Sequence, residues 1–160
     1  MLLVGDIPVA SLVSLLHRYG LELVFCDDDV PIPGSFWGEA EAGIVRNRVF
    51  VRNDTPVHSL LHETSHVVCM TAARRDTLDR DAGGDDLEES AVCYLQILLA
   101  DRIPGVGRDR VMSDMDAWGY SFRLGSTRAW FADDADDVKN FLLDHKLIDS
   151  SGAPTYSLRS

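Results

Sequence analysis

The pattern of apolar and polar positions predicts one helix and two strand-rich segments in the first third of the chain. Apolar residues recur at helical spacing over residues 9–20 ("VASLVSLLHRYG"), and the closing glycine is typical of a helix end. Residues 21–26 ("LELVFC") and 42–54 ("AGIVRNRVFVRND") are rich in β-forming residues. In the second strand segment the Arg46-Asn47 pair predicts a tight hairpin turn, although one long edge strand fits the pattern equally well.

Helical spacing begins again at residues 55–70, within "NDTPVHSLLHETSHVVCM". Thr55 is expected to be the N-cap and Pro56 the first helical residue, because proline has no N–H to leave unsatisfied at that position. A polar loop with a Gly83-Gly84 pair is expected to follow this helix.

The remaining pattern is helical. Residues 87–103 ("LEESAVCYLQILLADRI") predict a mostly apolar helix that ends near the following Pro-Gly pair. Further helices are expected over residues 110–122 and 126–148, where the acidic run 133–137 either breaks the second of them or caps its later half. The tail from Asp149 is expected to be irregular.

This order of elements predicts an α+β fold, a small antiparallel sheet packed on a helical core. The chain has 160 residues, which suits one compact domain, so residues 1–160 are expected to form a single unit. The composition is 46% hydrophobic and 26% charged, as in an ordinary globular protein.

Charge and cysteine content narrow the class of function. The net charge of −11 argues against nucleic acid as a partner, because binding to phosphates needs clustered lysine and arginine. We expect no membrane span, since no apolar run approaches about 18 residues, and we expect the N-terminus to belong to the fold rather than to a signal peptide. Three cysteines without a CxxC pair predict reduced thiols in a cytoplasmic protein.

The motif "HETSH" at residues 62–66 carries the clearest chemical signal. In a helix, residues four apart share a face, so His62 and His66 are able to direct two imidazole nitrogens at one zinc ion. Glu63 is expected to face the same cleft as a general base that takes a proton from a zinc-activated water. His58, one turn earlier, is expected to line the cleft, because three residues spread over eight positions of one straight helix converge poorly on a single ion.

A catalytic zinc site needs a third protein ligand, and the acidic start of the next helix offers candidates. "HETSH" followed by "EESAVCYLQILL" resembles the gluzincin metallopeptidases, in particular the ImmA/IrrE-type family, whose second helix reads approximately E-x-E-A-x-x-F-A-x-x-L-L. Aligned on Ala91, the resemblance implies a zincin-like fold in which His62, His66 and Glu88 bind Zn²⁺ and Glu63 is the base. The resemblance covers about residues 40–100.

Three positions depart from that family pattern: Ser90, Val92 and Leu95. Val92 removes an expected hydrogen-bond partner for a ligating histidine. Glu89 and Asp86 therefore stay open as the third ligand if the register of the helix differs.

Aromatic and basic residues elsewhere in the chain are further candidates for the same site. Phe36 and Trp37, in the loop before residues 42–54, either wall a substrate cleft or plug the core. Tyr120, Arg123 and Arg128 are candidates for stabilising an oxyanion, although core packing and surface exposure explain them as well.

The sequence thus predicts a zinc-dependent metallopeptidase that hydrolyses a peptide bond in a protein or peptide substrate. Two alternatives stay open: a zincin-fold binding or regulatory module with little or no catalysis, and a metal-free helical protein in which the motif has arisen by chance. A peptide substrate is expected to add as a strand along the edge of residues 43–52.

Overall fold

The computed structural model describes residues 1–35 and 40–160. Its strands are β1 (Glu22–Phe25), β2 (Gly43–Val45) and β3 (Arg48–Val51). Its helical elements are the 3-10 turn η1 (Val4–Asp6), α1 (Val9–Arg18), α2 (Val57–Cys69), α3 (Ala72–Asp76), α4 (Asp86–Ala100), α5 (Arg108–Trp118), the 3-10 turn η2 (Arg123–Gly125), α6 (Thr127–Asp133) and α7 (Asp136–Asp144). The α+β class is confirmed.

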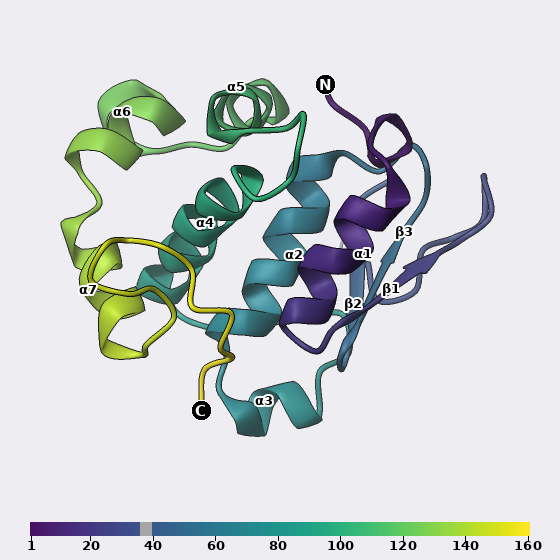
Figure 1. Ribbon diagram of the computed structural model, residues 1–160, viewed down its shortest axis with the longest axis horizontal. Helices are drawn as coiled ribbons and strands as arrows, with labels where there is room; N and C mark the ends of the chain where they lie inside the picture. The colour runs from purple at the N-terminus through teal and green to yellow at the C-terminus, as the bar shows by residue number, and fades with distance from the viewer. Residues whose placement is uncertain (36–39) are drawn as a thin grey trace.

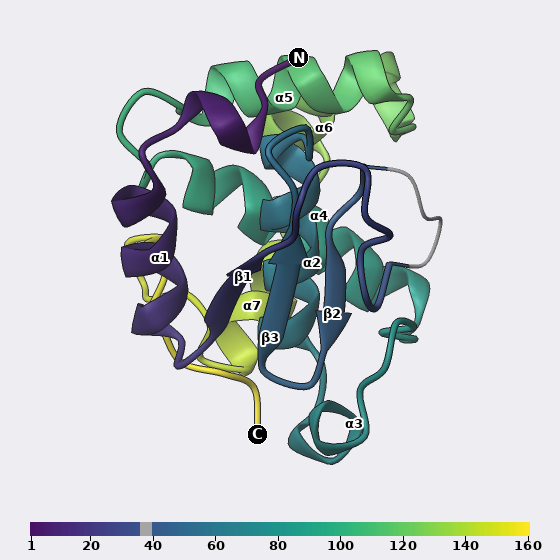
Figure 2. The ribbon, with the colours of Figure 1, turned by 90° about the vertical axis from the view of Figure 1, so that its right-hand side faces the viewer.

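The motif helix α2 lies at the centre of the molecule. It packs on β2 and β3 on one side and on α4 on the other, so that it lies between the sheet and α4 (Figure 1). Figure 2, turned by 90°, shows the sheet in front of α2. Burial on both sides explains why nearly every side chain of α2 is shielded from water.

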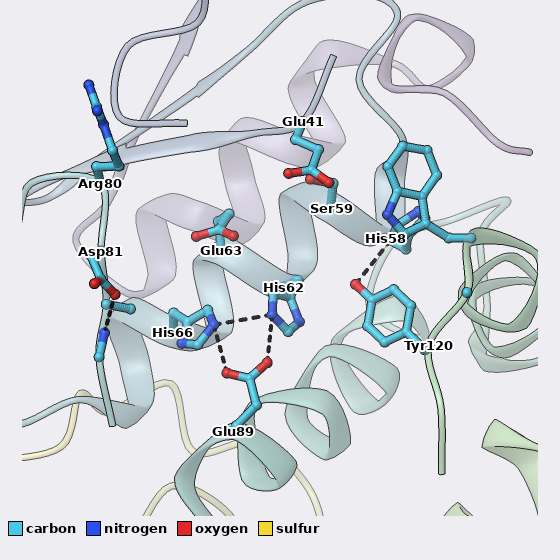
Figure 3. A pocket seen from close by; sticks show the side chains of 14 residues that line it. Glu41, His58, Ser59, His62, Glu63, His66, Arg80, Asp81, Glu89 and Tyr120 are labelled. Atoms are coloured by element: carbon cyan, nitrogen blue, oxygen red, sulfur yellow. Dashed lines mark hydrogen bonds and ion pairs between the residues drawn. The ribbon is translucent and has the colours of Figure 1, made fainter. Parts of the chain in front are cut away.

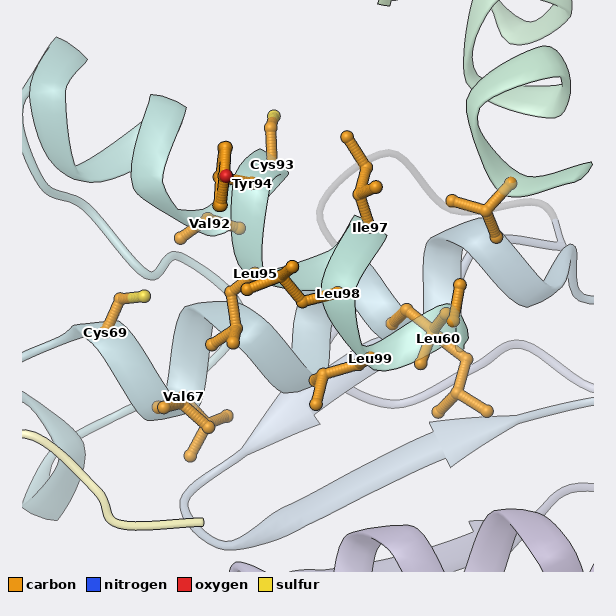
Figure 4. Close-up of a cluster of buried hydrophobic side chains, with 14 of the residues drawn as sticks. Leu60, Val67, Cys69, Val92, Cys93, Tyr94, Leu95, Ile97, Leu98 and Leu99 are labelled. Atoms are coloured by element: carbon orange, nitrogen blue, oxygen red, sulfur yellow. The ribbon is translucent and has the colours of Figure 1, made fainter. Parts of the chain in front are cut away.

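The contact between α2 and α4 is apolar through most of its length. Leu60 and Val67 on α2 and Leu95 and Leu99 on α4 are fully buried, and Figure 4 shows them in one cluster. Because these side chains interdigitate in a close-packed core, they fix how far α4 can slide or rotate against α2. The acidic first turn of α4 is thereby held beside the C-terminal half of the motif helix.

The sheet has the order β1-β3-β2, and its pairings are mixed. A tight turn joins β2 to β3 as an antiparallel hairpin, with Arg46 at a φ of 52°, which confirms the hairpin over the single long strand. β1 pairs in parallel with β3. The sheet is therefore not purely antiparallel as expected, because the connection after β1 carries the chain past β3 before β2 begins, and β1 meets β3 instead of β2.

The outer edge of β2 is also occupied. The backbone N–H of Ile44 donates to Gly34, the N–H of Arg80 donates to the Ile44 carbonyl, and the N–H of Arg46 donates to Leu78. A residue with a side chain at Gly43 would bring its Cβ within 1.9 Å of the Pro33 carbonyl oxygen, so glycine permits this close approach. An incoming peptide could add to this edge only by displacing residues 78–80, which goes against the expected strand addition.

The predicted helices form, with differences at their ends, and the segment 126–148 holds two helices, α6 and α7, because the acidic run 133–137 breaks it at Asp134 and Ala135. α2 begins at Val57 with Pro56 as the N-cap residue, and the Thr55 hydroxyl accepts from the Arg52 N–H rather than from the first turn of the helix. The expected polar loop contains the short helix α3, whose N-cap Thr71 accepts from the Arg74 N–H. None of the helices in the described part of the chain is long and apolar enough to cross a bilayer.

A buried ion-pair network joins the start of α4 to the C-terminal tail. The Glu88 carboxylate, 5% exposed, accepts two hydrogen bonds of 2.8 Å from Arg74 and one of 3.0 Å from Arg159. The Arg159 guanidinium also donates to the Cys69 carbonyl at the end of α2, and the Arg159 N–H donates to the Val68 carbonyl. The irregular tail is thus tied to both helices that bear the candidate site.

We expect Glu88→Gln to lower the free energy of unfolding by about 2–3 kcal/mol, because two arginines lose their buried counter-charge. The two arginines are partly exposed, so this loss is smaller than the roughly 3–5 kcal/mol typical of fully buried pairs. Urea unfolding followed by circular dichroism measures it. The matched control is Glu22→Gln, which removes the exposed Glu22–Arg48 pair and is expected to cost under about 0.5 kcal/mol. Equal losses in the two variants would contradict a structural role for the network.

Candidate metal centre

Helix α2 directs two imidazole nitrogens at one point. Residues four apart lie on the same face of a helix, and the Nε2 atoms of His62 and His66 are 3.1 Å apart. The two rings meet edge to face, with centroids separated by 4.6 Å. Both side chains are largely buried, so the two nitrogens face a confined space rather than bulk water.

A carboxylate from α4 completes the group. One oxygen of Glu89 is 3.1 Å from His62 Nε2, and the other is 3.1 Å from His66 Nε2. Tetrahedral zinc, with bonds near 2.0–2.2 Å, would place its ligand atoms roughly 3.3 Å apart. The spacing of the three donors therefore fits one small ion, and His62, His66 and Glu89 could hold a metal.

The carboxylate in this group is Glu89, not Glu88, which the family alignment favoured. Glu88 continues into the stripe of Val92, Leu95 and Leu99, which faces the core, and there it binds Arg74 and Arg159. Glu89 is turned by about 100° from Glu88 and faces the histidines. Asp86, the other alternative, is exposed in the first turn and lies outside the group.

Gln96, two turns after Glu89, fixes the orientation of His62. Its amide nitrogen donates to the His58 carbonyl at 3.0 Å, and a carbonyl only accepts, so the amide oxygen must face His62. That oxygen is 2.8 Å from His62 Nδ1. Nδ1 therefore carries the hydrogen, and in the neutral ring Nε2 presents its lone pair to the candidate centre.

The presence of Val92 predicts that a ligating histidine lacks a hydrogen-bond partner. Gln96 supplies such a partner to His62. The sequence contains a sign of this contact, because Gln96 is a polar residue within the apolar run "YLQILL". A glutamine with no exposed surface must find hydrogen-bond partners inside the protein. His66 differs from His62 in this respect. Its Nδ1 is buried and has no hydrogen-bond partner among the described residues.

The titration behaviour of the group follows from its contacts. Burial disfavours the charged form of His62, but interactions with Tyr120, Cys93 and Glu89 raise its pKa well above the ordinary value. Burial opposes the charged form of Glu89 as well, yet hydrogen bonds with the two histidines hold the pKa of Glu89 far below its usual range. A proton and a metal ion compete for the histidine nitrogens, so metal affinity should rise with pH.

The group lies in a pocket of about 550 Å³. Figure 3 shows Glu89 on one side of the two imidazoles and the Glu63 carboxylate on the other, facing into the pocket. Burial raises the pKa of Glu63, an effect that the two histidines oppose and that Glu89 reinforces. Glu63 therefore has the position expected of a base beside a metal, without belonging to the three-donor group.

The structure places the other candidate residues of the sequence in different surroundings. His58 and Tyr120 line the pocket, with His58 Nδ1 3.2 Å from the Tyr120 hydroxyl. Arg123 pairs with Asp134, and Arg128 pairs with Asp109 at the surface, so neither of these arginines reaches the pocket. Phe36 and Trp37 lie outside the described residues.

The identity of the third donor can be tested by metal content. We expect Glu89→Gln to lower the bound metal to well below one equivalent, because an amide is a poorer ligand than a carboxylate. Glu88→Gln and Asp86→Asn are the controls and should retain the wild-type stoichiometry. Elemental analysis of protein purified without a histidine tag measures this, and loss of metal from Glu88→Gln alone would contradict the assignment to Glu89.

The role of Gln96 can be separated from its contribution to packing. We expect Gln96→Met to weaken metal binding by about 10–100-fold, because His62 loses the acceptor that fixes its tautomer. Gln96→Glu keeps an acceptor toward His62 Nδ1 and should bind metal more tightly than Gln96→Met, although it also disturbs the contact with His58. Competition with a chromogenic chelator gives both affinities, and equal weakening in the two variants would refute the tautomer argument.

Comparison with models of known protein families, with curated proteins and with solved structures found no match for this chain. The chemistry of the centre therefore has to be argued from the geometry of its own residues.

Proposed function

We propose that the protein is a zinc-dependent peptidase of the gluzincin group, with Glu89 rather than Glu88 as the third ligand. The observation that carries the proposal is the convergence of two imidazole nitrogens and one carboxylate, each 3.1 Å from the next, with Glu63 beside them in an open pocket. A chance pair of histidines on a helix would not require a carboxylate from another helix to face both of them.

The donor set favours zinc. Two histidines and one carboxylate are a known ligand set of hydrolytic zinc sites, in which one position is left for water or substrate. When bound, zinc supplies Lewis acidity, lowering the pKa of water from about 15.7 to near 7 and polarising a carbonyl group.

The chain's own residues would carry the proton transfers. The Glu63 carboxylate accepts a proton from the water that attacks the scissile carbonyl, and it then delivers that proton to the leaving amine. Gln96 holds His62 in the tautomer that leaves Nε2 free. Glu89 lies on the side of the imidazoles away from Glu63 (Figure 3), so it would leave the Glu63 side of the group to substrate.

Substrate would be held mainly by the pocket. Because residues 78–80 and Gly34 already use the outer edge of β2, a peptide gains few backbone hydrogen bonds there without a rearrangement. Side chains that line the pocket would then determine which residues of a substrate are accepted.

The decisive variant is Glu63→Gln. It preserves the size of the side chain and removes the base, so we expect the variant to retain about one equivalent of zinc while its kcat falls by at least about 10²-fold. Peptide libraries read by mass spectrometry, with the zinc content of the same samples, provide the measurement. Full activity in this variant would rule out the mechanism.

A second candidate is a metal-stabilised binding module with little catalysis. It is favoured by the unpartnered Nδ1 of His66, because catalytic zinc ligands normally have that nitrogen hydrogen-bonded. Bound zinc together with inactivity of the wild-type protein on broad libraries would favour this module. A chance motif would instead give no bound zinc, and metal content would not change in His62→Ala.

A further inference from the structure

One end of the pocket gathers groups that do not take part in the candidate metal centre. Figure 3 shows Glu41 close to Ser59, with His58 and Tyr120 nearby and with Arg80 and Asp81 at the other end of the pocket. Trp118 also lines the pocket and is one of the side chains that influence the Glu41 carboxylate. We call the part formed by Glu41, Trp118, His58 and Tyr120 the Glu41 end.

Glu41 is a carboxylate without a basic partner. It is half buried, and no lysine or arginine of the described chain lies within 4.0 Å of it. Burial and the nearby charge of Glu63 raise the pKa of Glu41, while His62 and the hydrogen bond from Trp118 lower it. Its negative charge is therefore poorly compensated, and a cationic group entering the pocket would be attracted to it.

Trp118 offers an aromatic surface at the same place. Its side chain is 45% exposed, although it is one of the largest apolar groups of the chain. Its ring packs 5.1 Å from that of His58, and its side chain is among the groups that lower the pKa of Glu41. An exposed indole beside a carboxylate is suited to an ammonium or guanidinium group, which the ring face and the negative charge both attract.

His58 is a buried polar residue that packs against Trp118 at this end of the pocket. The residue is 1% exposed and lines the pocket, but its Nε2 has no hydrogen-bond partner among the described residues. His58 Nδ1 is 3.2 Å from the Tyr120 hydroxyl, which also accepts a hydrogen bond from the Gln96 amide at 3.5 Å.

The charges of the pocket agree with a cationic ligand. Glu41, Glu63, Asp81 and Glu89 line it together with one arginine, Arg80, and the whole chain carries a net charge of −11. Arg80 lies beside Asp81, at the far end from Glu41 (Figure 3). A positive side chain would thus be drawn to the Glu41 end rather than repelled there.

We propose that Glu41 and Trp118 form a specificity subsite that accepts a lysine or arginine side chain of the peptide substrate. This inference rests on the proposed peptidase function for its biological meaning. The subsite itself is defined by binding, which can be measured without turnover.

The test uses the zinc-loaded Glu63→Gln protein, which should bind peptides without cleaving them. It is immobilised and exposed to pools of N-acetylated, C-amidated hexapeptides, random except for one fixed residue: lysine, arginine, glutamine or glutamate. We expect the lysine and arginine pools to be retained at least about 10-fold better than the glutamine pool, as for a charge-assisted contact. Quantification is by mass spectrometry of the eluted peptides.

Variants in the same background assign the preference to residues. Adding Glu41→Gln should reduce the preference to within about 2-fold, and Glu41→Lys should reverse it in favour of glutamate pools. Trp118→Phe keeps an aromatic face and should retain part of the preference, whereas Trp118→Ala should lose most of it. Asp81→Asn, which removes a carboxylate at the other end of the pocket, is the matched control and should leave the preference intact.

The outcomes separate this inference from the peptidase proposal. Equal retention of all pools, no retention of any pool, or a basic preference that persists in Glu41→Gln would overturn the subsite. A basic preference that depends on Glu41, in a protein whose wild-type form cleaves nothing, would support the subsite and reject the peptidase. Cleavage that depends on Glu63, together with peptide binding that shows no basic preference dependent on Glu41, would support the peptidase and reject the subsite.

Discussion

The packing of α4 against α2 is the contact on which the candidate centre depends, because the centre draws its donors from both helices. His62 and His66 share a face of α2 whatever the rest of the chain does, but Glu89 meets them only if α4 has one particular rotation and one particular position along its axis. Leu60, Val67, Leu95 and Leu99 fix both quantities by close packing. The same pair of helices thus forms the apolar core and the polar centre. A change in core packing would therefore displace the Glu89 carboxylate.

Two adjacent carboxylates at the start of α4 have opposite environments for the same reason. Glu88 points toward the core and is neutralised by Arg74 and Arg159, one from the connection before α4 and one from the C-terminal tail. Glu89 points toward the histidines and is half exposed. The network around Glu88 ties the first turn of α4 to Arg74 and to the C-terminal tail. A buried carboxylate that already has two arginines gains little from binding a metal, whereas the ion-pair partners of Glu89 among the described residues are the two imidazoles.

Local signals predicted the elements well and their mutual rotation poorly. The motif helix, the apolar helix after it and the Arg46-Asn47 hairpin follow from periodicity and turn chemistry, which act over a few residues. The choice between Glu88 and Glu89 depends on which stripe of α4 faces α2, and that is decided by the volumes of side chains more than 20 residues apart. Val92 on its own predicts that a ligating histidine lacks a hydrogen-bond partner, whereas Gln96, one turn later, supplies that contact. The parallel pairing of β1 with β3 also depends on the path of a long connection, for which the sequence carries no periodic signal.

The outer edge of β2 is already hydrogen-bonded, so the pocket would have to supply most of the contacts to a bound peptide. A hydrolase that aligns its substrate by backbone pairing recognises any extended peptide and leaves selectivity to a few side-chain contacts. Here residues 78–80 and Gly34 take those backbone positions, so in the proposed peptidase affinity for a peptide would come from groups inside the pocket. Those groups are unevenly distributed, with Arg80 and Asp81 beside each other at one end and Glu41 without a basic partner in the described chain at the other. In the proposed peptidase, such an asymmetric charge distribution would orient a substrate as well as select it, because only one direction of binding would place a positive side chain near Glu41 while the scissile carbonyl lies beside Glu63.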